Sequence, residues 1–266
     1  MRPKSTKPAS LIAGFPEFWQ RVYDAYPLFF GVAKKLEGLQ NEVLRRPVSG
    51  ELPKVLHFIL GTVSNSFGAL ITLALNGYGN DAMKIARGMF EAELNALHLS
   101  KHLEKVRDYV DFQAVQDKRL LNYMREFSPE LVPEIPENRI ADIEREFASV
   151  EPRFLNGKKL RGTWSKASRR EMAKEAGLIQ AYLTFYSWAS SLHHSDVAGL
   201  SFQTDREGFA VDMAPSLEWI DLALISGHGS LIRTLECYNN VAQLGMAEDI
   251  EKAIEDFKTA WQVSNR

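Results

Sequence analysis

A long stretch of the chain carries no charged side chain. Between Val55 and Asn80 there is no Asp, Glu, Lys or Arg, and a helix of that length could cross a bilayer. Its middle reads GTVSNSFG, however, and Asn65 between two serines would be costly at the centre of a membrane. We therefore expect a buried core helix and no membrane span, because a helix that is apolar on all sides is typical of a protein interior.

Apolar residues recur at helical spacing through most of the chain. Gly177 and Gly245 stand where helices commonly end, and Ser168 with Glu171 forms a capping box. Helices are predicted at Phe15–Arg46 with a break near Pro27, Pro53–Asn76, Asp81–His102, Glu104–Phe127, Glu137–Glu151, Ser168–Ala176, Leu178–His194, Ser216–Leu244 and Ala247–Gln262. Strand-like alternation is confined to SFQTDREGFAVD, which centres on a turn signal.

These patterns predict an all-α fold: an irregular up-and-down helical bundle with short accessory helices and at most one small β-hairpin near 201–212. Residues 1–14 are expected to form a flexible N-terminal tail and residues 15–266 a single helical domain. The formal net charge of −2 argues against a nucleic-acid binder that is basic overall. The single cysteine, Cys237, excludes an internal disulfide and favours a cytoplasmic location.

The helix predicted at Asp81–His102 carries a narrow polar stripe between two apolar faces. At helical spacing the stripe spans about 80° and consists of Arg87, Glu91, Asn95, His98 and His102. A surface helix normally has a broad polar face, so this helix is expected to be mostly buried with a polar seam. Arg87 and Glu91 are four residues apart and can form an ion pair.

A second apolar helix, Leu178–His194, is predicted to face that seam, because buried polar groups need partners. Its own polar residues cluster on one side in an α-helical projection: Gln180, Thr184, Ser187, Ser191 and His194, with Ser190 beside them. Further along, Gly227 and Gly229 bracket His228 within a helical run and allow close approach of another backbone.

Two runs of sequence resemble a known family. LNGYGNDAMKIARGMFEAELN, and RGTWSKASRREMAKEAG followed by YLTFYSWASSLHHS, resemble the two signatures of the bacterial domain-of-unknown-function family 5677. The resemblance covers about Leu75 to Gly199 and implies an all-α fold without an established activity. The residues of this chain that match the family's two signatures are Gly77, Ala82, Arg87, Glu91, Trp164, Tyr182, Tyr186, Ser187, Ser190 and either His193 or His194.

A more distant similarity is to the HEPN class of helical domains, many of which are RNases in toxin–antitoxin and antiphage systems. Those domains carry an Arg shortly before a His on the same helix. Here Trp188 and Ala189 stand five residues before His193 and His194, and no Arg precedes them on that helix. The similarity therefore implies a nuclease only if Arg87 supplies the positive charge from another helix.

The segment Arg153–Lys174 is the candidate surface for an anionic partner. It holds eight Lys and Arg side chains against Glu171 alone, with Trp164 among them. Such a mixture suits phosphate groups and a stacked base, so RNA or a phosphorylated small molecule is the expected partner. A solvated helix face or an acidic partner would fit the same charges.

The sequence favours a scaffold or ligand-binding module, and the alternative is a metal-independent RNase or nucleotide-processing defence effector. Whether the protein is an enzyme stays open. The candidate catalytic residues are Arg87, Glu91, His194 and His193, since a histidine can act as general acid or base beside an arginine that binds phosphate. The candidate ligand-binding residues are Asn95, His98, Tyr186, Ser187, Ser190, Ser191, Lys158, Lys159, Arg161 and Trp164.

No metal or cofactor is expected. His98 and His102 are spaced to clamp an ion, but di-iron bundles need Glu-x-x-His pairs, and this chain offers Asn95-x-x-His98 instead. No cysteine cluster is available for zinc. A homodimer through the long apolar helices is a further expectation.

Overall fold

The computed structural model describes residues 16–194 and 215–264, and most of that chain is helical. This confirms the expected all-α fold. The helices are α1 (Pro16–Ala25), α2 (Pro27–Leu44), α3 (Glu51–Leu75), α4 (Gly79–Lys101), α5 (Val106–Phe127), α6 (Glu137–Phe154), α7 (Arg169–Glu175), α8 (Ile179–Ala181), α9 (Ser187–His194), α11 (Ile220–Ala242) and α12 (Ala247–Ser264). Two 3₁₀ turns, η1 (Leu103–Lys105) and η2 (Pro129–Glu134), and a π-helical segment, η3 (Tyr182–Tyr186), are the other helical elements of the described residues.

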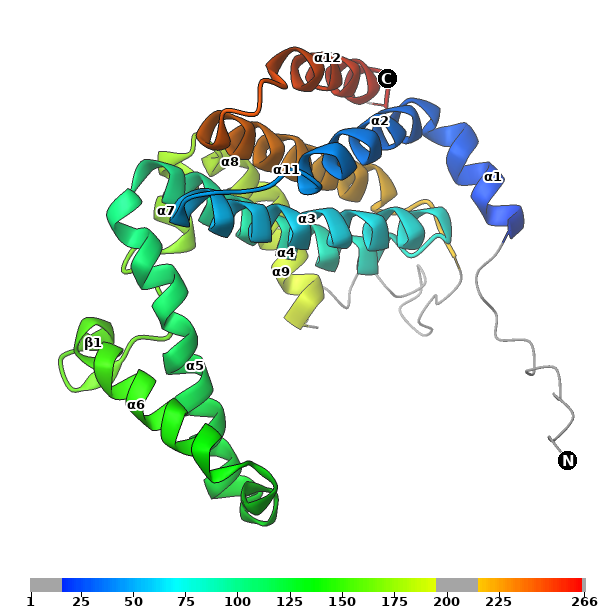
Figure 1. Cartoon of the computed structure of the whole chain (residues 1–266). Helices are drawn as coiled ribbons and strands as arrows, with labels where there is room; N and C mark the ends of the chain where they lie inside the picture. The colour runs from blue at the N-terminus through cyan, green and yellow to red at the C-terminus, as the bar shows by residue number, and fades with distance from the viewer. Residues whose placement is uncertain (1–15, 195–214, 265–266) are drawn as a thin grey trace, which may run out of the picture.

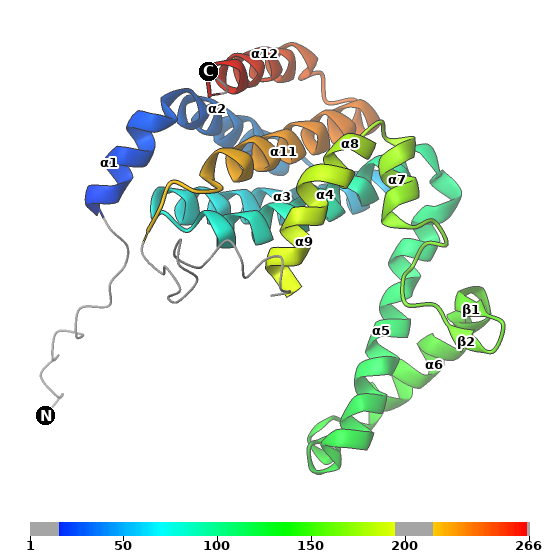
Figure 2. The same ribbon diagram turned by 180° about the vertical axis from the view of Figure 1, so that it is seen from behind.

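The core is a bundle of three long helices, α3, α4 and α11, each of which packs against the other two (Figures 1 and 2). α2 and α12 cover one side of α11, and α7 to α9 lie along α4. α11 and α3 approach closely at Gly227, where a Cβ atom would lie 2.6 Å from Leu70 Cδ1. The neighbour at this crossing is thus a leucine side chain, whereas the glycines around His228 predict close approach of another backbone.

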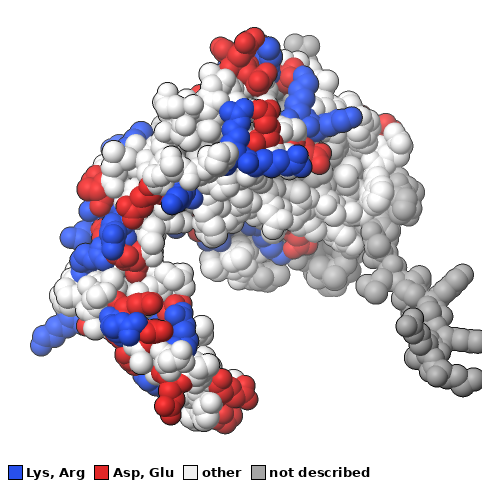
Figure 3. Space-filling model, viewed as in Figure 1, with Lys and Arg blue, Asp and Glu red and all other residues white. Residues whose placement is uncertain are grey.

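α3 contains most of the uncharged stretch of the sequence, from Val55 to Leu75. By length and composition it is a candidate to cross a membrane, although one such helix is weak evidence for a span. Its buried residues, among them Leu60, Val63 and Leu70, pack against α4 and α11. Its exposed side carries small polar residues, and the hydroxyls of Thr62 and Thr72 donate to carbonyls one turn earlier. Figure 3 shows a wide face without charged side chains over this helix.

The described residues contain a β-hairpin at a place where the sequence pattern did not predict one. β1 (Leu155–Asn156) pairs antiparallel with β2 (Lys159–Leu160). The turn begins at Gly157, whose φ of +62° is a left-handed conformation that glycine adopts at little cost. Asn156 pairs with Lys159, so Gly157 and Lys158 form a two-residue loop. Glycine at the first loop position is a known hairpin signal, so the sequence contained local information for this turn. The hairpin expected near 201–212, like the expected tail at 1–14, lies outside the described residues.

α5 and α6 pack against each other and project away from the three core helices as an arm (Figures 1 and 2). Phe112 and Phe154 meet edge to face with ring centroids 5.2 Å apart at the base of the arm. Arg139 binds Asp117 at 3.0 Å farther out. Charged side chains of both signs cover the arm, as Figure 3 shows.

Candidate functional site

The first half of the polar seam of α4 is a closed network of four side chains. Arg87 pairs with Glu91 across one helical turn, with Nη2 and Oε1 2.9 Å apart. Arg87 Nε donates to Ser190 Oγ at 2.9 Å, and the Tyr186 hydroxyl donates to Glu91 Oε1 at 2.8 Å. The Arg87 and Glu91 side chains are 17% and 28% exposed. The seam therefore exists, and its charges are neutralised within it.

The facing helix presents different residues from those that an α-helical projection places there. Tyr186 and Ser190 bind the seam, whereas Ser187 is exposed and donates to the Tyr182 carbonyl at 3.2 Å. His193 and His194 are exposed at the end of α9, and Ser191 is partly buried. The expectation that Ser187 and His194 face Arg87 is thus wrong for this geometry.

The helix that faces α4 contains a π-helical segment, η3, but this segment does not account for the difference: the observed contacts at Tyr186 and Ser190 come one residue before the projected ones, whereas an extra residue would move them one residue later. A π turn closes its hydrogen bonds from i to i+5 and uses one residue more than an α turn. Every residue after Tyr186 is therefore rotated by about 100° from its place in an uninterrupted α-helix. π segments arise as single turns within α-helices, often at functional sites, and the one here delivers the Tyr186 hydroxyl to Glu91.

Tyr186 acts in this network as a hydrogen-bond donor. Burial and the neighbouring Glu91 carboxylate raise the pKa of the Tyr186 phenol, against the weaker opposite effect of Arg87. The guanidinium of Arg87 also lies over the Tyr186 ring, 5.2 Å from its centroid. The phenol and the guanidinium therefore both contact the Glu91 carboxylate.

Replacing Arg87 with alanine is expected to lower the free energy of unfolding by about 1–3 kcal/mol, because Glu91 and Ser190 lose a half-buried charged partner. Urea denaturation of the variant and the wild-type protein measures the change. Lys84→Ala is the matched control, since it breaks the more exposed Lys84–Asp81 pair on the same helix. An Arg87→Ala protein as stable as the Lys84→Ala protein would contradict the structural role of the seam.

The second half of the seam depends on an arginine that the sequence analysis did not single out. Asn95 Oδ1 accepts hydrogen bonds from Arg169 Nη1 at 2.6 Å and from Trp164 Nε1 at 3.2 Å. Arg169 Nε lies 4.0 Å from Glu91 Oε2, so Arg169 links the two halves. The capping box of Ser168 and Glu171 fixes Arg169 as the first residue of α7. That capping signal was visible in the sequence, but its position beside Asn95 was not.

A cavity of about 610 Å³, here called the α4–α5 cavity, opens where Arg169 meets Asn95. Aromatic, amide and positively charged side chains share its wall. It is lined by Lys54, Val55, Phe58, Asn95, Tyr109, Val110, Phe112, Gln113, Gln116, Gly162, Thr163, Trp164 and Arg169. Burial raises the pKa of Tyr109, and the nearby Arg169 acts in the opposite direction. Two predicted ligand-binding residues, Asn95 and Trp164, thus reach one cavity, while His98 lies behind Trp164, with ring centroids 5.9 Å apart.

The basic segment 153–174 is less available to a partner than its charge suggests. Arg153 binds Asp108 at 3.2 Å and also Asp111. Arg161 donates to the carbonyls of Trp164 at 3.1 Å and Arg153 at 2.9 Å, and its guanidinium covers the Phe154 ring. These arginines hold the hairpin region to α5 and α6, because buried or crowded carbonyls and carboxylates need donors.

Trp164 is only 6% exposed. Its ring packs against Tyr109 edge to face, with centroids 5.1 Å apart. The expectation that Trp164 stacks on a base from an open surface therefore needs correction, since any stacking partner would have to enter the α4–α5 cavity. Lys158 and Lys159, by contrast, are exposed on the hairpin.

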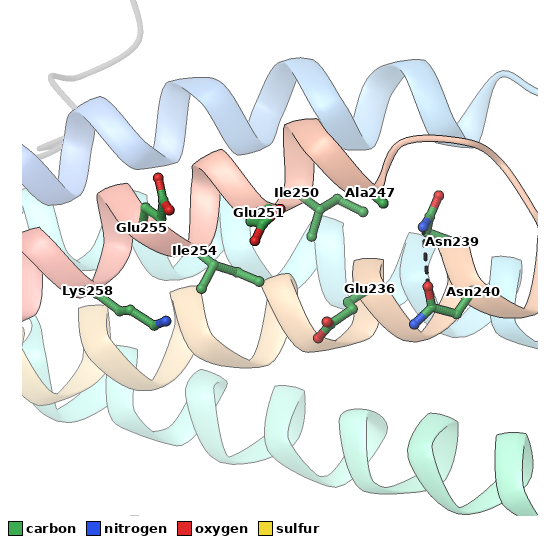
Figure 4. Close-up of a pocket in the computed structure, with 9 residues that line it drawn as sticks. All are labelled: Glu236, Asn239, Asn240, Ala247, Ile250, Glu251, Ile254, Glu255 and Lys258. Carbon is green, nitrogen blue, oxygen red and sulfur yellow. Dashed lines mark hydrogen bonds between the residues drawn. The ribbon is translucent and has the colours of Figure 1, made fainter.

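A second cavity, of about 320 Å³, lies between α11 and α12 (Figure 4). Glu236, Glu251 and Glu255 contribute carboxylates to its wall, and Lys258 contributes the one amine. Figure 4 shows Lys258 at one end of the groove and the hydrogen-bonded pair Asn239 and Asn240 at the other. No residue predicted from the sequence as a site lies among its lining residues.

The fold and the seam define a class: an all-α protein whose central helices are joined by a polar network beside an open amphipathic cavity. The chain belongs to a family of unknown function (DUF5677), whose model matches residues 54–209. The matched region includes α3 from Lys54 onward, α4, the α4–α5 cavity and the π-helical segment. No curated protein and no solved structure matches the chain.

Proposed function

We propose that the protein is a ligand-binding module and that its ligand occupies the α4–α5 cavity. The observation that carries the proposal is the placement of Arg169, which is held by Asn95 at the wall of this cavity beside Trp164 and Tyr109. A volume of about 610 Å³ falls within the roughly 300–1,000 Å³ typical of small-molecule sites. Such sites combine apolar walls with a few fixed polar groups.

The lining indicates a planar, negatively charged ligand. Lys54 and Arg169 supply positive charge, and an arginine fork is well suited to phosphate or carboxylate. Phe58, Tyr109 and Trp164 supply aromatic surface for a flat ring. Phosphorylated small molecules such as nucleoside monophosphates combine these features, and we take them as the ligand class.

A nuclease function has weaker support. Arg87 is paired with Glu91, Tyr186 and Ser190, so its charge is already committed among the described residues. His193 and His194 are solvent-exposed and lie next to one another, with ring centroids 5.1 Å apart. A phosphodiester cleaved by this histidine pair would need its negative charge to be stabilised by a group other than Arg87.

The ligand proposal is tested by calorimetric titration of the full chain with AMP, CMP, GMP and UMP. At least one nucleotide is expected to bind, and Arg169→Ala is expected to weaken binding tenfold or more, because a charged hydrogen bond is lost. Arg170→Ala is the matched control, since Arg170 is the exposed neighbour of Arg169 and should leave the affinity unchanged.

Arg169 also supports Asn95, so a second variant is needed that leaves this contact intact. Val110 lines the cavity and is 44% exposed, and Val110→Trp is expected to place an indole ring in the cavity, obstruct it and weaken binding without unfolding the protein. Circular dichroism melting checks the fold of each variant. If the nucleotides do not bind, or if Val110→Trp binds as the wild type does, the cavity is not the site of this ligand class.

A further inference from the structure

Two histidines and a glutamate meet where α4 and α7 end. His98 and His102 are one turn apart at the C-terminus of α4, and Glu175 is the last residue of α7. His98 Nδ1 lies 2.8 Å from Glu175 Oε2, and His102 Nε2 lies 2.7 Å from Glu175 Oε1. The donor atoms of all three side chains lie within 4.8 Å of one another. We propose that these three residues bind a divalent transition-metal ion.

His102 lies between two carboxylates. Its Nδ1 lies 3.5 Å from Glu104 Oε1, while its Nε2 faces Glu175. An ion between Nε2 and Glu175 would leave Nδ1 directed toward the Glu104 carboxylate. Carboxylates that orient a metal-binding histidine through its other nitrogen are common around metal sites.

The local electrostatics also favour a cation. The C-terminal end of a helix carries a partial negative charge, and a carboxylate there is disfavoured. α4 and α7 both end here, and Glu175 adds a full negative charge to the end of α7. Lys101 Nζ donates to the Glu175 carbonyl oxygen at 2.8 Å and offsets part of this potential. A divalent ion at the carboxylate would offset the rest.

The three ligands are held before the ion binds. His98 is 7% exposed and its ring packs between Trp164 and His102, with centroids 5.9 Å and 4.3 Å away. A tetrahedral zinc site separates its donor atoms by roughly 3.3 Å, so Glu175 needs only a small movement away from the histidines to admit an ion. Little side-chain freedom remains to be lost, and this favours affinity.

Two nitrogens and one carboxylate indicate the kind of ion. Imidazole ligands suit zinc, copper, iron and nickel, whereas calcium and magnesium prefer oxygen alone. The His102 and Glu175 side chains are 35% and 33% exposed, so solvent reaches the site and can supply a fourth ligand. Three protein ligands and one water are the pattern of reactive zinc sites. The site is separate from the α4–α5 cavity and does not depend on the proposed nucleotide.

Calorimetric titration of metal-free full-length protein with Zn²⁺ tests the proposal. We expect one equivalent of Zn²⁺ to bind with micromolar or tighter affinity. At a free Zn²⁺ concentration a hundredfold above the dissociation constant, Tm should rise by about 5 °C or more. His102→Ala and Glu175→Gln are each expected to weaken Zn²⁺ binding at least tenfold and to remove the rise in Tm. Both residues are partly exposed, so both variants should fold.

The matched control is the double variant His193→Ala/His194→Ala, which removes the exposed histidine pair on α9 and should bind Zn²⁺ as the wild type does. Arg169→Ala should also retain Zn²⁺ binding, which separates this site from the nucleotide proposal. The proposal is overturned if the wild-type protein binds no Zn²⁺ at micromolar concentrations. It is equally overturned if the His102→Ala protein binds Zn²⁺ unchanged while the histidine double variant loses it.

Discussion

Replacing Arg233 with alanine is expected to lower the free energy of unfolding by about 3–5 kcal/mol, the cost of removing one partner from a buried ion pair. Glu93 on α4 is 0% exposed. Its carboxylate accepts hydrogen bonds from Ser230 Oγ at 2.7 Å, from Arg233 Nη2 at 3.1 Å and from Arg233 Nε. Without Arg233 the buried negative charge keeps only the serine hydroxyl. The pair joins α4 to α11, so its loss affects the centre of the core.

Thermal and urea denaturation measure this effect. A protein of this size is expected to lose about 2–4 °C in Tm for each kcal/mol, so the predicted decrease is about 6–20 °C. Lys252→Ala is the control, because it breaks the exposed Lys252–Glu248 pair on α12 and should leave Tm unchanged. Adding Glu93→Gln to Arg233→Ala removes the unpaired charge and should recover part of the loss. No decrease, or no recovery in the double variant, would contradict this account.

The unfolding free energy is expected to fall between pH 6.5 and pH 4 because of His228. Burial lowers the pKa of His228 to about 4, although Leu224 and Phe29 carbonyls near its two nitrogens oppose the change. An unfolded histidine titrates near pH 6.5. Below that pH the unfolded chain takes up a proton that the folded protein excludes, so acid favours unfolding. The shift corresponds to about 3 kcal/mol once both states are protonated.

Urea denaturation at pH 7 and at several lower pH values tests this prediction. His228→Gln removes the titrating group and should reduce the dependence of stability on pH in this range, whatever its stability at pH 7. His193→Ala, which removes an exposed histidine, should retain the wild-type dependence. Three phenylalanine rings, those of Phe29, Phe67 and Phe257, surround His228. A His228→Gln protein with the wild-type pH dependence would show that this burial does not control protonation.

The sequence predicted the helices well because their signals are local. Apolar spacing, capping residues and the break at Pro27 each act within one or two turns, and the structure places α1 and α2 on either side of that break. The ion pair of Arg87 and Glu91 was also predictable from a spacing of four. The hairpin at 155–160, which was not predicted, has a local signal too, since Gly157 is the first of the two turn residues between Asn156 and Lys159.

The sites were less predictable because their residues meet only through tertiary packing. Glu175 lies 73 residues beyond His102, and no spacing rule connects them. Glu93 was not identified either: it lies on α4 among apolar neighbours, and its partners Ser230 and Arg233 come from α11. Trp164 was expected at the surface because its neighbours in the sequence are basic, but Asn95 and Tyr109 hold it inside.

The π-helical segment has a consequence for how motifs in this region are compared between proteins. Tyr182 and Tyr186 stack on each other with centroids 4.9 Å apart, and the α-helical register resumes at Ser187. A sequence motif that spans the π-helical segment and α9 therefore contains two segments whose side chains are rotated relative to each other about the helix axis. A relative with one residue fewer in this segment could still have the same serines and histidines after it. Those side chains would nevertheless face a different neighbour. An aligned histidine in such a relative need not be an equivalent one.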